Sequence, residues 1–211
     1  RDMEKLASWA CRYSDICVYM KPFVSALYSS YAGKATTGFF RLSNRAMRAV
    51  RVLRVLFVMI ELEPQRYCRS LLSFTPKEAS MVVEYDASLS GVGVLLYSRA
   101  PGRADCPVGG FSVDITSLGF GTDAGYQNAA EFIAAVLGTV CLVQLFPTCK
   151  SFVFRGDSMS ALSWARSGRA KGDRVFNSAF VFVSLLLITS TGVAGTEHLS
   201  SEENFRTDEL S

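Results

Sequence analysis

The chain has 211 residues, enough for one domain with a sizeable core and an additional segment. Hydrophobic residues make up 49% of it and charged residues only 19%, a composition that excludes an intrinsically disordered protein. The net charge is only +3, but residues 1–75 carry 12 basic and 5 acidic side chains and residues 76–211 carry 10 and 14, so we expect a basic surface attached to an acidic site.

Residues 1–75 are expected to be mainly helical. The pattern predicts an amphipathic helix over residues 3–10 and a turn-rich patch around Lys21-Pro22 and Ala32-Gly33-Lys34. A longer helix is predicted to begin after the N-cap residue Ser43 and to end near residue 62, before a proline.

Arginines recur along the helix predicted to begin at Ser43. Their steps of three and four residues place most of them on one face, opposite Met47, Leu53 and Phe57. Two interpretations of this face stay open. Exposed arginines are most often simply solvated, whereas guanidinium groups also suit phosphate oxygens, although no aromatic residues are interleaved here to stack nucleic-acid bases. The arginines concerned are Arg41, Arg45, Arg48, Arg51 and Arg54.

The pattern changes at residue 76, where we place a domain boundary, with a helical segment at 1–75 and a second domain at 76–211. Two β-rich runs joined by a short turn with a glycine predict a hairpin. The order of elements predicts an α/β fold with a mixed five-stranded sheet flanked by helices, preceded by the mainly helical segment. Strands are predicted over 81–85, 92–97, 109–115, 151–155 and 193–198, and helices over 127–145, 158–167, 177–188 and from residue 204 onward.

Two long stretches without charged residues, 132–149 and 175–196, raise the question of membrane spans. Polar and helix-ending residues such as Pro147 and Gly192 interrupt them. We therefore expect two buried core helices and no membrane partner.

The cysteines and the first residues indicate where the protein is found. The six cysteines form no C-x-x-C pair and no dense regular spacing, which argues against a zinc site or a disulfide framework. Reduced thiols indicate an intracellular protein, in the cytoplasm or nucleus. The first residues lack the pattern of a signal peptide and read as the interior of a longer chain.

Four acidic residues fall where a carboxylate is costly unless a positive charge lies against it. Asp86 ends the first predicted strand, and Asp157 follows the fourth. Glu131 lies in a helix where the following residues are apolar, and Asp208 lies early in the last helix. Sites in α/β sheets collect at strand ends, so the four carboxylates can meet there. Such a cluster repels itself, and two divalent ions about 4 Å apart would neutralise it and serve phosphoryl transfer.

Four segments of the sequence resemble, in chain order, the motifs of retroelement ribonuclease H domains. Residues 85–93 resemble the D-A-S-x-x-G-x-G opening, and residues 127–131 resemble the segment in which the family's Glu opens the first helix. Residues 156–158 resemble the D-S or D-N motif that ends the fourth strand. Residues 198–211 are similar to the closing motif H-x-P-G-x-x-N-x-x-A-D-x-L-S.

The resemblance extends to spacing, with a few departures in the closing motif. The four acids are separated by 45, 26 and 51 residues, which suits this fold, and His198 precedes Asp208 by 10 residues, as in the family. The sequence departs from the motif at Ser200-Ser201, where Pro-Gly is usual, and at Thr207, where Ala is usual. Neither departure changes an acid.

The resemblance implies the activity of ribonuclease H, a metal-dependent endonuclease that hydrolyses the RNA strand of RNA·DNA hybrids, as part of a reverse transcriptase polyprotein. Its cofactors would be two Mg²⁺ ions, with Mn²⁺ as a substitute. Its partners would be the RNA·DNA hybrid and the polymerase domain of the same polyprotein. Residues 1–75 look more loosely like the connection between these two domains, and gypsy-like or DIRS-like retrotransposons are the relatives that the resemblance suggests.

The resemblance also implies roles for single residues. Asp86, Glu131, Asp157 and Asp208 would be catalytic metal ligands, with Asp86 and Asp157 shared between the two ions. His198 would assist proton transfer or product release, and the alternative is a histidine at a strand end bound to a backbone carbonyl. Four polar side chains would contact the 2′-hydroxyls of RNA, although helix capping and turn bonding explain them equally well. They are Ser88, Gln127, Asn128 and Ser158.

Two other functions remain open at this point. The domain could be a non-catalytic ribonuclease-H-like module, structural or nucleic-acid-binding, of a polymerase or of a domesticated host protein. The intact set of acids favours the enzyme. Another nuclease of the same superfamily, such as an integrase, lacks the Asn-x-x-x-Asp ending that Asn204 and Asp208 form here.

Overall fold

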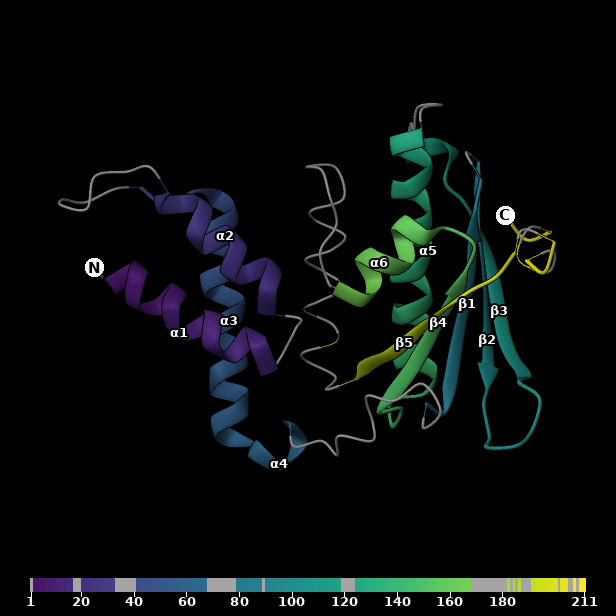
Figure 1. The fold of residues 1–211 in the computed structure, drawn as a ribbon, viewed down its shortest axis with the longest axis horizontal. Coiled ribbons are helices and arrows are strands. Elements are labelled where there is room, and N and C mark those ends of the chain that lie inside the picture. Colours follow the sequence, from purple (N-terminus) through teal and green to yellow (C-terminus); the bar gives the residue numbers. More distant parts are fainter. Residues whose placement is uncertain are drawn as a thin grey trace. The chain divides into compact units, whose positions relative to one another are not determined.

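The structure, a computed structural model, consists of two compact units, Arg1–Cys68 and Arg69–Ser211, which are described separately (Figure 1). The boundary predicted at residue 76 lies outside the described residues and stays a prediction. The structure describes residues 2–16, 20–32, 41–67, 79–88, 90–118, 124–167, 182, 184, 186, 191–200, 202–204, 207 and 209–211.

The first unit is helical, with α1 (Asp2–Ile16), α2 (Lys21–Tyr31), α3 (Asn44–Leu62) and α4 (Pro64–Tyr67). The turn predicted at Lys21-Pro22 is wrong, because both residues belong to the first turn of α2. Proline is tolerated there, since the first turn of a helix needs no donor from its backbone nitrogen.

Helix α3 begins as predicted, and its buried face matches the predicted apolar face at Leu53. The Oγ atom of Ser43 accepts a hydrogen bond of 3.2 Å from the backbone N of Ala46, which caps the helix. The buried residues are Ala46, Ala49, Leu53 and Leu56, whereas Met47 is 39% exposed.

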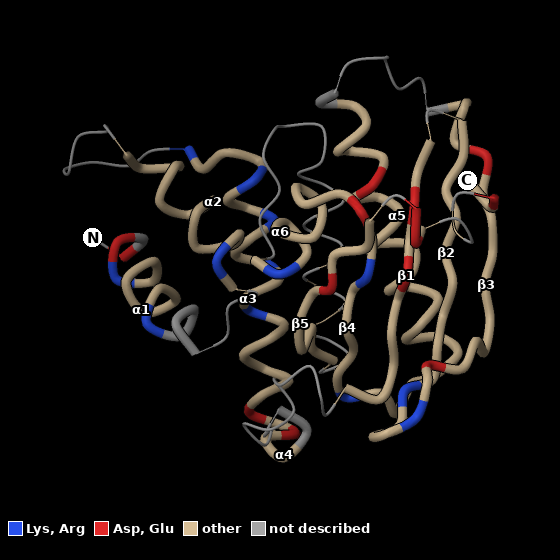
Figure 2. The backbone as a smooth tube through the Cα atoms, turned by 45° about the vertical axis from the view of Figure 1, so that its right-hand side comes forward, with Lys and Arg blue, Asp and Glu red and all other residues tan. Residues whose placement is uncertain are grey.

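The arginines of α3 lie on its exposed side. A surface cavity of about 470 Å³ is lined there by residues from the start of the helix and the segment before it. Figure 2 shows basic residues (blue) along α3 and acidic residues (red) on elements of the second unit. The lining residues are Arg41, Leu42, Asn44, Met47, Arg48 and Arg51.

The second unit contains one five-stranded sheet in the order β3-β2-β1-β4-β5 (Figure 1). Its strands β1 to β3 are antiparallel neighbours, and β1, β4 and β5 are parallel neighbours. The structure therefore confirms the predicted α/β fold with a mixed five-stranded sheet flanked by helices. The strands are β1 (Met81–Ala87), β2 (Gly91–Ser98), β3 (Cys106–Asp114), β4 (Ser151–Gly156) and β5 (Gly192–His198).

Helices α5 (Ala124–Leu145) and α6 (Met159–Ser167) pack on the sheet, and η4 (Thr116–Leu118) is a short 3-10 helix. A Cβ added at Gly138 of α5 would lie 2.6 Å from the side chain of Val83, so the glycine brings α5 close to β1. Within α5, the stretch Tyr126–Leu145 is long and apolar enough to cross a membrane by length and composition, and 56% of it is buried. The role of this stretch as a buried core helix without a membrane partner stays a prediction.

Aromatic rings fill the space between the sheet and these helices. The ring of Phe132 on α5 meets those of Trp164 and Phe182 edge-on, with centroids 5.9 Å apart in each pair. Phe154 of β4 also contacts Phe182. Such edge-to-face pairs stabilise a core beyond the area that they bury. The helix predicted over 177–188 is described only at residues 182, 184 and 186, which are helical.

The C-terminal segment lies against the start of β2. The Oγ atom of Ser88 donates a hydrogen bond of 2.9 Å to the backbone O of Ser211. A Cβ added at Gly93 would lie 2.5 Å from the backbone O of Thr207 and 2.8 Å from Cβ of Leu210. The glycines of residues 85–93 therefore leave room for the segment that follows β5. Of the last helix predicted from residue 204, the described residues show helix at Thr207 and turns around it.

This close approach predicts that Gly93→Ala destabilises the second unit. The added methyl group has to displace backbone atoms, and overpacking of this kind costs about 1–3 kcal/mol. Gly109→Ala on β3 is the matched control, because a Cβ there meets nothing within 4 Å. Thermal unfolding followed by circular dichroism should show a lower Tm for Gly93→Ala and an unchanged or higher Tm for Gly109→Ala. Equal values for the two variants would contradict the packing described here.

Candidate metal centre

Three of the four predicted acids converge in the second unit. Asp86 comes from the end of β1, Glu131 from α5, and Asp157 directly follows β4. One carboxylate oxygen from each lies within 4.8 Å of the other two. Asp208 lies outside the described residues, so its part in the site stays a prediction.

The fold explains why these residues meet. Strands β1 and β4 are parallel neighbours, so their carboxyl ends reach the same edge of the sheet. Helix α5 is tied to the end of β1 by Gln127, whose Nε2 donates hydrogen bonds to the backbone O of Ala87 and, at 3.3 Å, to Oε1 of Glu131. One side chain therefore links the strand end to the helical carboxylate.

Glu131 is the most deeply buried of the three acids, with 4% of its surface exposed. Burial, together with the nearby charges of Asp86 and Asp157, raises the pKa of Glu131 to about 9. Its Oε2 atom is buried and has no hydrogen-bond partner among the described residues. The hydroxyl of Tyr85 is also buried without a partner there, and burial and the charges of Glu131 and Asp157 raise its pKa well above the ordinary value.

This arrangement fits divalent metal ions. Carboxylate oxygens are the ligands that Mg²⁺ and Mn²⁺ prefer, and three of them meet here. Burial first, and then the charges of Asp86 and Asp157, raise the pKa of Glu131, so the charged form of this carboxyl is unfavourable in its place. The unpartnered Oε2 of Glu131 offers a ligand atom that no described residue uses. A cation at this place would offset the repulsion and bind that oxygen.

Asp86 is held from both sides by the C-terminal segment. The Nδ2 atom of Asn204 donates a hydrogen bond of 3.1 Å to one of its oxygens, and the Oγ atom of Ser211 donates one of 2.7 Å to the other. Asn204 is fully buried, and the hydroxyl of Thr207 donates to its Oδ1 at 2.7 Å. That bond turns the amide so that its NH₂ group faces Asp86.

Sequence reasoning missed Asn204 and Thr207 as parts of the site. The signal for Asn204 was present, since an asparagine occupies this position in the closing motif. Thr207 stands where the family usually has Ala, and its hydroxyl takes a part in the site that an Ala cannot take.

The structure places His198 beside the acids and on the surface. Its Nε2 atom lies 3.1 Å from the backbone O of Asp157, at the end of β5. This is the contact expected for a histidine at a strand end, and it also keeps an exposed imidazole next to Asp157. A role of His198 in the reaction stays a prediction.

The four predicted substrate-binding residues make hydrogen bonds within the second unit. The Oγ atom of Ser88 accepts from the backbone N of Gly91 at 2.9 Å, which closes the turn between β1 and β2. The Oγ atom of Ser158 accepts from the backbone N of Ala161 at 3.3 Å and donates to Oδ1 of Asn128 at 3.4 Å. Ser88 and Ser158 thus take the turn and capping roles considered for them, and contacts of these side chains or of Gln127 with RNA stay predictions.

Comparisons with known proteins give structural similarity only. No protein-family model and no curated protein matches the sequence significantly. Among solved structures, ribonuclease H1 from the halophilic archaeon Halobacterium salinarum is 20% identical, with 62% of this chain and 92% of that chain covered and a TM-score of 0.45. LC11-RNase H1 in complex with an RNA/DNA hybrid is 17% identical, with 62% and 92% covered and a TM-score of 0.48.

The protease-reverse transcriptase of prototype foamy virus is also similar, at 11% identity, with 64% of this chain and 20% of that chain covered and a TM-score of 0.40. The similar structures thus include ribonuclease H proteins and a viral reverse transcriptase. At such low identity these likenesses concern the fold alone.

The raised pKa of Glu131 predicts a pH-dependent stability of the metal-free protein. Between pH 4.5, the ordinary pKa of this carboxyl, and about pH 9, the folded protein keeps a proton that the unfolded chain has lost. The free energy of unfolding should therefore fall as the pH rises through this window. Glu131→Gln removes this titrating carboxyl, so in EDTA it should raise Tm more at pH 8 than at pH 5. Each kcal/mol of unfolding free energy gained should raise Tm by about 2–4 °C.

The control for this measurement is Glu202→Gln, which makes the same change at an exposed residue of the second unit. Its Tm should differ from that of the parent by the same amount at both pH values. If Glu131→Gln behaved like this control, Glu131 would not be the group that titrates abnormally.

Proposed function

We propose that the chain is a ribonuclease H that hydrolyses the RNA strand of RNA·DNA hybrids with two divalent metal ions. The observation that carries this proposal is the meeting of Asp86, Glu131 and Asp157, three acids that are far apart in sequence, with oxygens within 4.8 Å of one another. They are also the acids at which the sequence resembles ribonuclease H motifs. With Asp208, they would form the catalytic set.

Each acid would have a distinct task at the metal centre. Asp86 and Asp157 come from neighbouring parallel strands and would be shared between the ions, while Glu131 and Asp208 would complete one site each. When bound, Mg²⁺ or Mn²⁺ would activate a water molecule and stabilise the charge that develops at the phosphodiester. Asn204 and Ser211 orient Asp86 through its two oxygens, so this ligand is preorganised.

Other side chains would serve the substrate. The exposed imidazole of His198 lies next to Asp157 and would assist proton transfer or product release. Polar groups near the strand ends would bind the 2′-hydroxyls by which RNA differs from DNA. The candidates are Ser88, Gln127, Asn128 and Ser158, of which the first three belong to the segments that carry Asp86 and Glu131.

We further propose that the domain belongs to an intracellular reverse transcriptase polyprotein of a gypsy-like or DIRS-like retrotransposon. The support is the order of the four motifs in the sequence and the basic helical segment before them. In this proposal residues 1–75 connect the ribonuclease H domain to the polymerase domain, its partner in the polyprotein.

Asp86→Asn should slow cleavage of the RNA strand in a labelled RNA·DNA hybrid by about 10² to 10³ or more, the effect of losing one preorganised group that stabilises charge in a reaction, while hybrid binding persists. Asp114→Asn is the matched control, because Asp114 is an exposed aspartate at the end of β3. Parent and control should cleave only with Mg²⁺ or Mn²⁺. Binding without cleavage by the parent itself would favour the non-catalytic module, the second function considered.

The arginines of α3 give a separate prediction about substrate binding. If they contact phosphates, replacing Arg45, Arg48 and Arg51 by Gln weakens hybrid binding and flattens its salt dependence. The slope of log affinity against log salt should fall by about 1 for each phosphate that the variant no longer neutralises, because fewer counterions are released.

The control for this triple variant removes the same charge elsewhere, by Lys5→Gln, Arg12→Gln and Arg103→Gln, all at exposed residues. It should keep the parental slope within the error of the measurement. If the α3 variant also keeps the parental slope and affinity, α3 does not bind the hybrid, and its arginines are a solvated or protein-docking face.

A further inference from the structure

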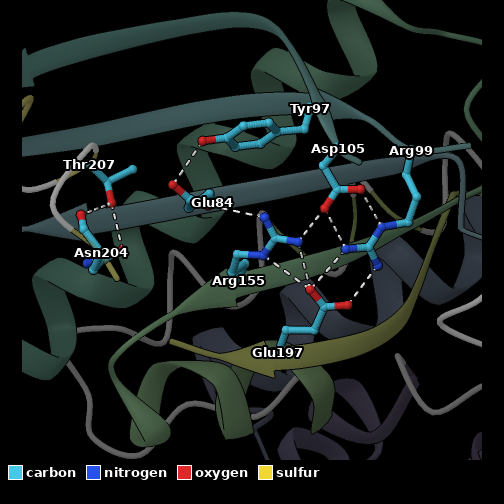
Figure 3. A network of polar contacts seen from close by, with 8 residues as sticks. All are labelled: Glu84, Tyr97, Arg99, Asp105, Arg155, Glu197, Asn204 and Thr207. Atoms are coloured by element: carbon cyan, nitrogen blue, oxygen red, sulfur yellow. Dashed lines mark hydrogen bonds and ion pairs between the residues drawn. The ribbon is translucent and has the colours of Figure 1, made fainter. Parts of the chain in front are cut away.

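A network of charged side chains lies across one face of the sheet in the second unit (Figure 3). Val83 contacts α5 through Gly138, so its neighbour in β1, Glu84, points to the opposite face. Besides Glu84, the network contains side chains from β2, β4 and β5 and from the turn between β2 and β3. Its members are Glu84, Tyr97, Arg99, Asp105, Arg155 and Glu197.

Arg155 of β4 is the centre of this network. Its Nη1 atom lies 3.4 Å from Oε2 of Glu84 on β1, and its Nη2 atom lies 2.9 Å from Oε2 of Glu197 on β5. The same guanidinium contacts Asp105 and lies 5.7 Å from the centre of the Tyr97 ring. One side chain therefore connects the three parallel strands of the sheet.

The strand register places this connection directly before the metal centre. Arg155 is the cross-strand partner of both Glu84 and Glu197. The pair Glu84 and Arg155 is also the last one between β1 and β4. Two residues further along, each segment reaches an aspartate, Asp86 in β1 and Asp157 directly after β4. Strands β1 and β4 are no longer paired there. The ion pair is thus the last cross-link before the two carboxylates.

The buried negative charge of Glu84 makes its ion pair with Arg155 hard to replace. Glu84 is only 5% exposed, and among the described residues Arg155 is the one cation in contact with it. The hydroxyl of Tyr97 donates to Glu84 at 3.1 Å but carries no positive charge. Without Arg155 the network would hold three carboxylates against the single guanidinium of Arg99. A buried unpaired carboxylate is strongly unfavourable, so the ends of β1 and β4 would rearrange.

We infer that Arg155 is a positioning residue of the metal centre, which fixes the separation of Asp86 and Asp157 by holding β1 and β4 together at their last pair. The inference rests on the proposed function, since it assumes that these two aspartates share metal ions. Arg99 is the internal reference. It forms equally short bonds, 2.8 Å to Asp105 and 2.7 Å to Glu197, but does not contact Glu84.

The test compares Arg155→Met with Arg99→Met in the full chain. Mn²⁺ affinity is measured by calorimetry and by electron paramagnetic resonance of free Mn²⁺, and Tm is measured in EDTA. Both variants should lower Tm, because both break the network. Only Arg155→Met should weaken Mn²⁺ binding, by about 10-fold or more, the effect of losing a residue that orients metal ligands. Its cleavage rate should recover at high metal concentration, and Arg155→Lys should restore part of the affinity.

If Arg155→Met does not fold, Glu84→Leu tests the same contact, because it removes the oxygen that Arg155 binds on β1 and leaves Arg155 its contacts with Asp105 and Glu197. It should then weaken Mn²⁺ binding as well. Mn²⁺ affinities equal to the parental value in Arg155→Met or, failing that, Glu84→Leu would overturn the inference and leave the network a structural one. Absence of Mn²⁺ binding and cleavage in the parent would instead contradict the proposed function and the inference together.

Discussion

Repulsion between three carboxylates is the constraint on which this domain depends. Asp86, Glu131 and Asp157 lie within 4.8 Å of one another, an arrangement that opposes folding unless other parts of the structure hold it. Parallel pairing of β1 and β4 brings two of these acids to one edge, and close packing of α5 brings the third. The pairing of β1 and β4 and the packing of α5 therefore keep these three acids close together.

Asp86 and Glu131 differ in the hydrogen bonds that their carboxyl groups accept. Asp86 receives two hydrogen bonds from the C-terminal segment, one at each of its oxygens. Glu131 keeps one oxygen without a partner among the described residues, and its pKa is raised to about 9. The three acids are therefore unequal before any metal binds, and the same proton that relieves the repulsion at Glu131 would have to leave when a cation binds there.

Sequence reasoning predicted the sheet and the meeting of three acids because both follow from local patterns. Strand runs, a turn and acids at strand ends can be read residue by residue, and the family motifs add their order. The network around Arg155 could not be predicted, since it depends on which residues of parallel strands lie opposite each other. The turn expected at Lys21-Pro22 was wrong because a proline that opens a helix and a proline in a turn look alike in a single sequence.

The bonds from the C-terminal segment to Asp86 join residues that are 118 and 125 positions apart. Contacts over such long separations close large loops, and closing them costs more chain entropy than forming the local hairpin of β1 and β2. Asp86 therefore belongs to a local strand pair through its backbone and to long-range contacts through its side chain. A change that displaces Asn204 and Ser211 would remove both donors from Asp86 and leave the hairpin in place.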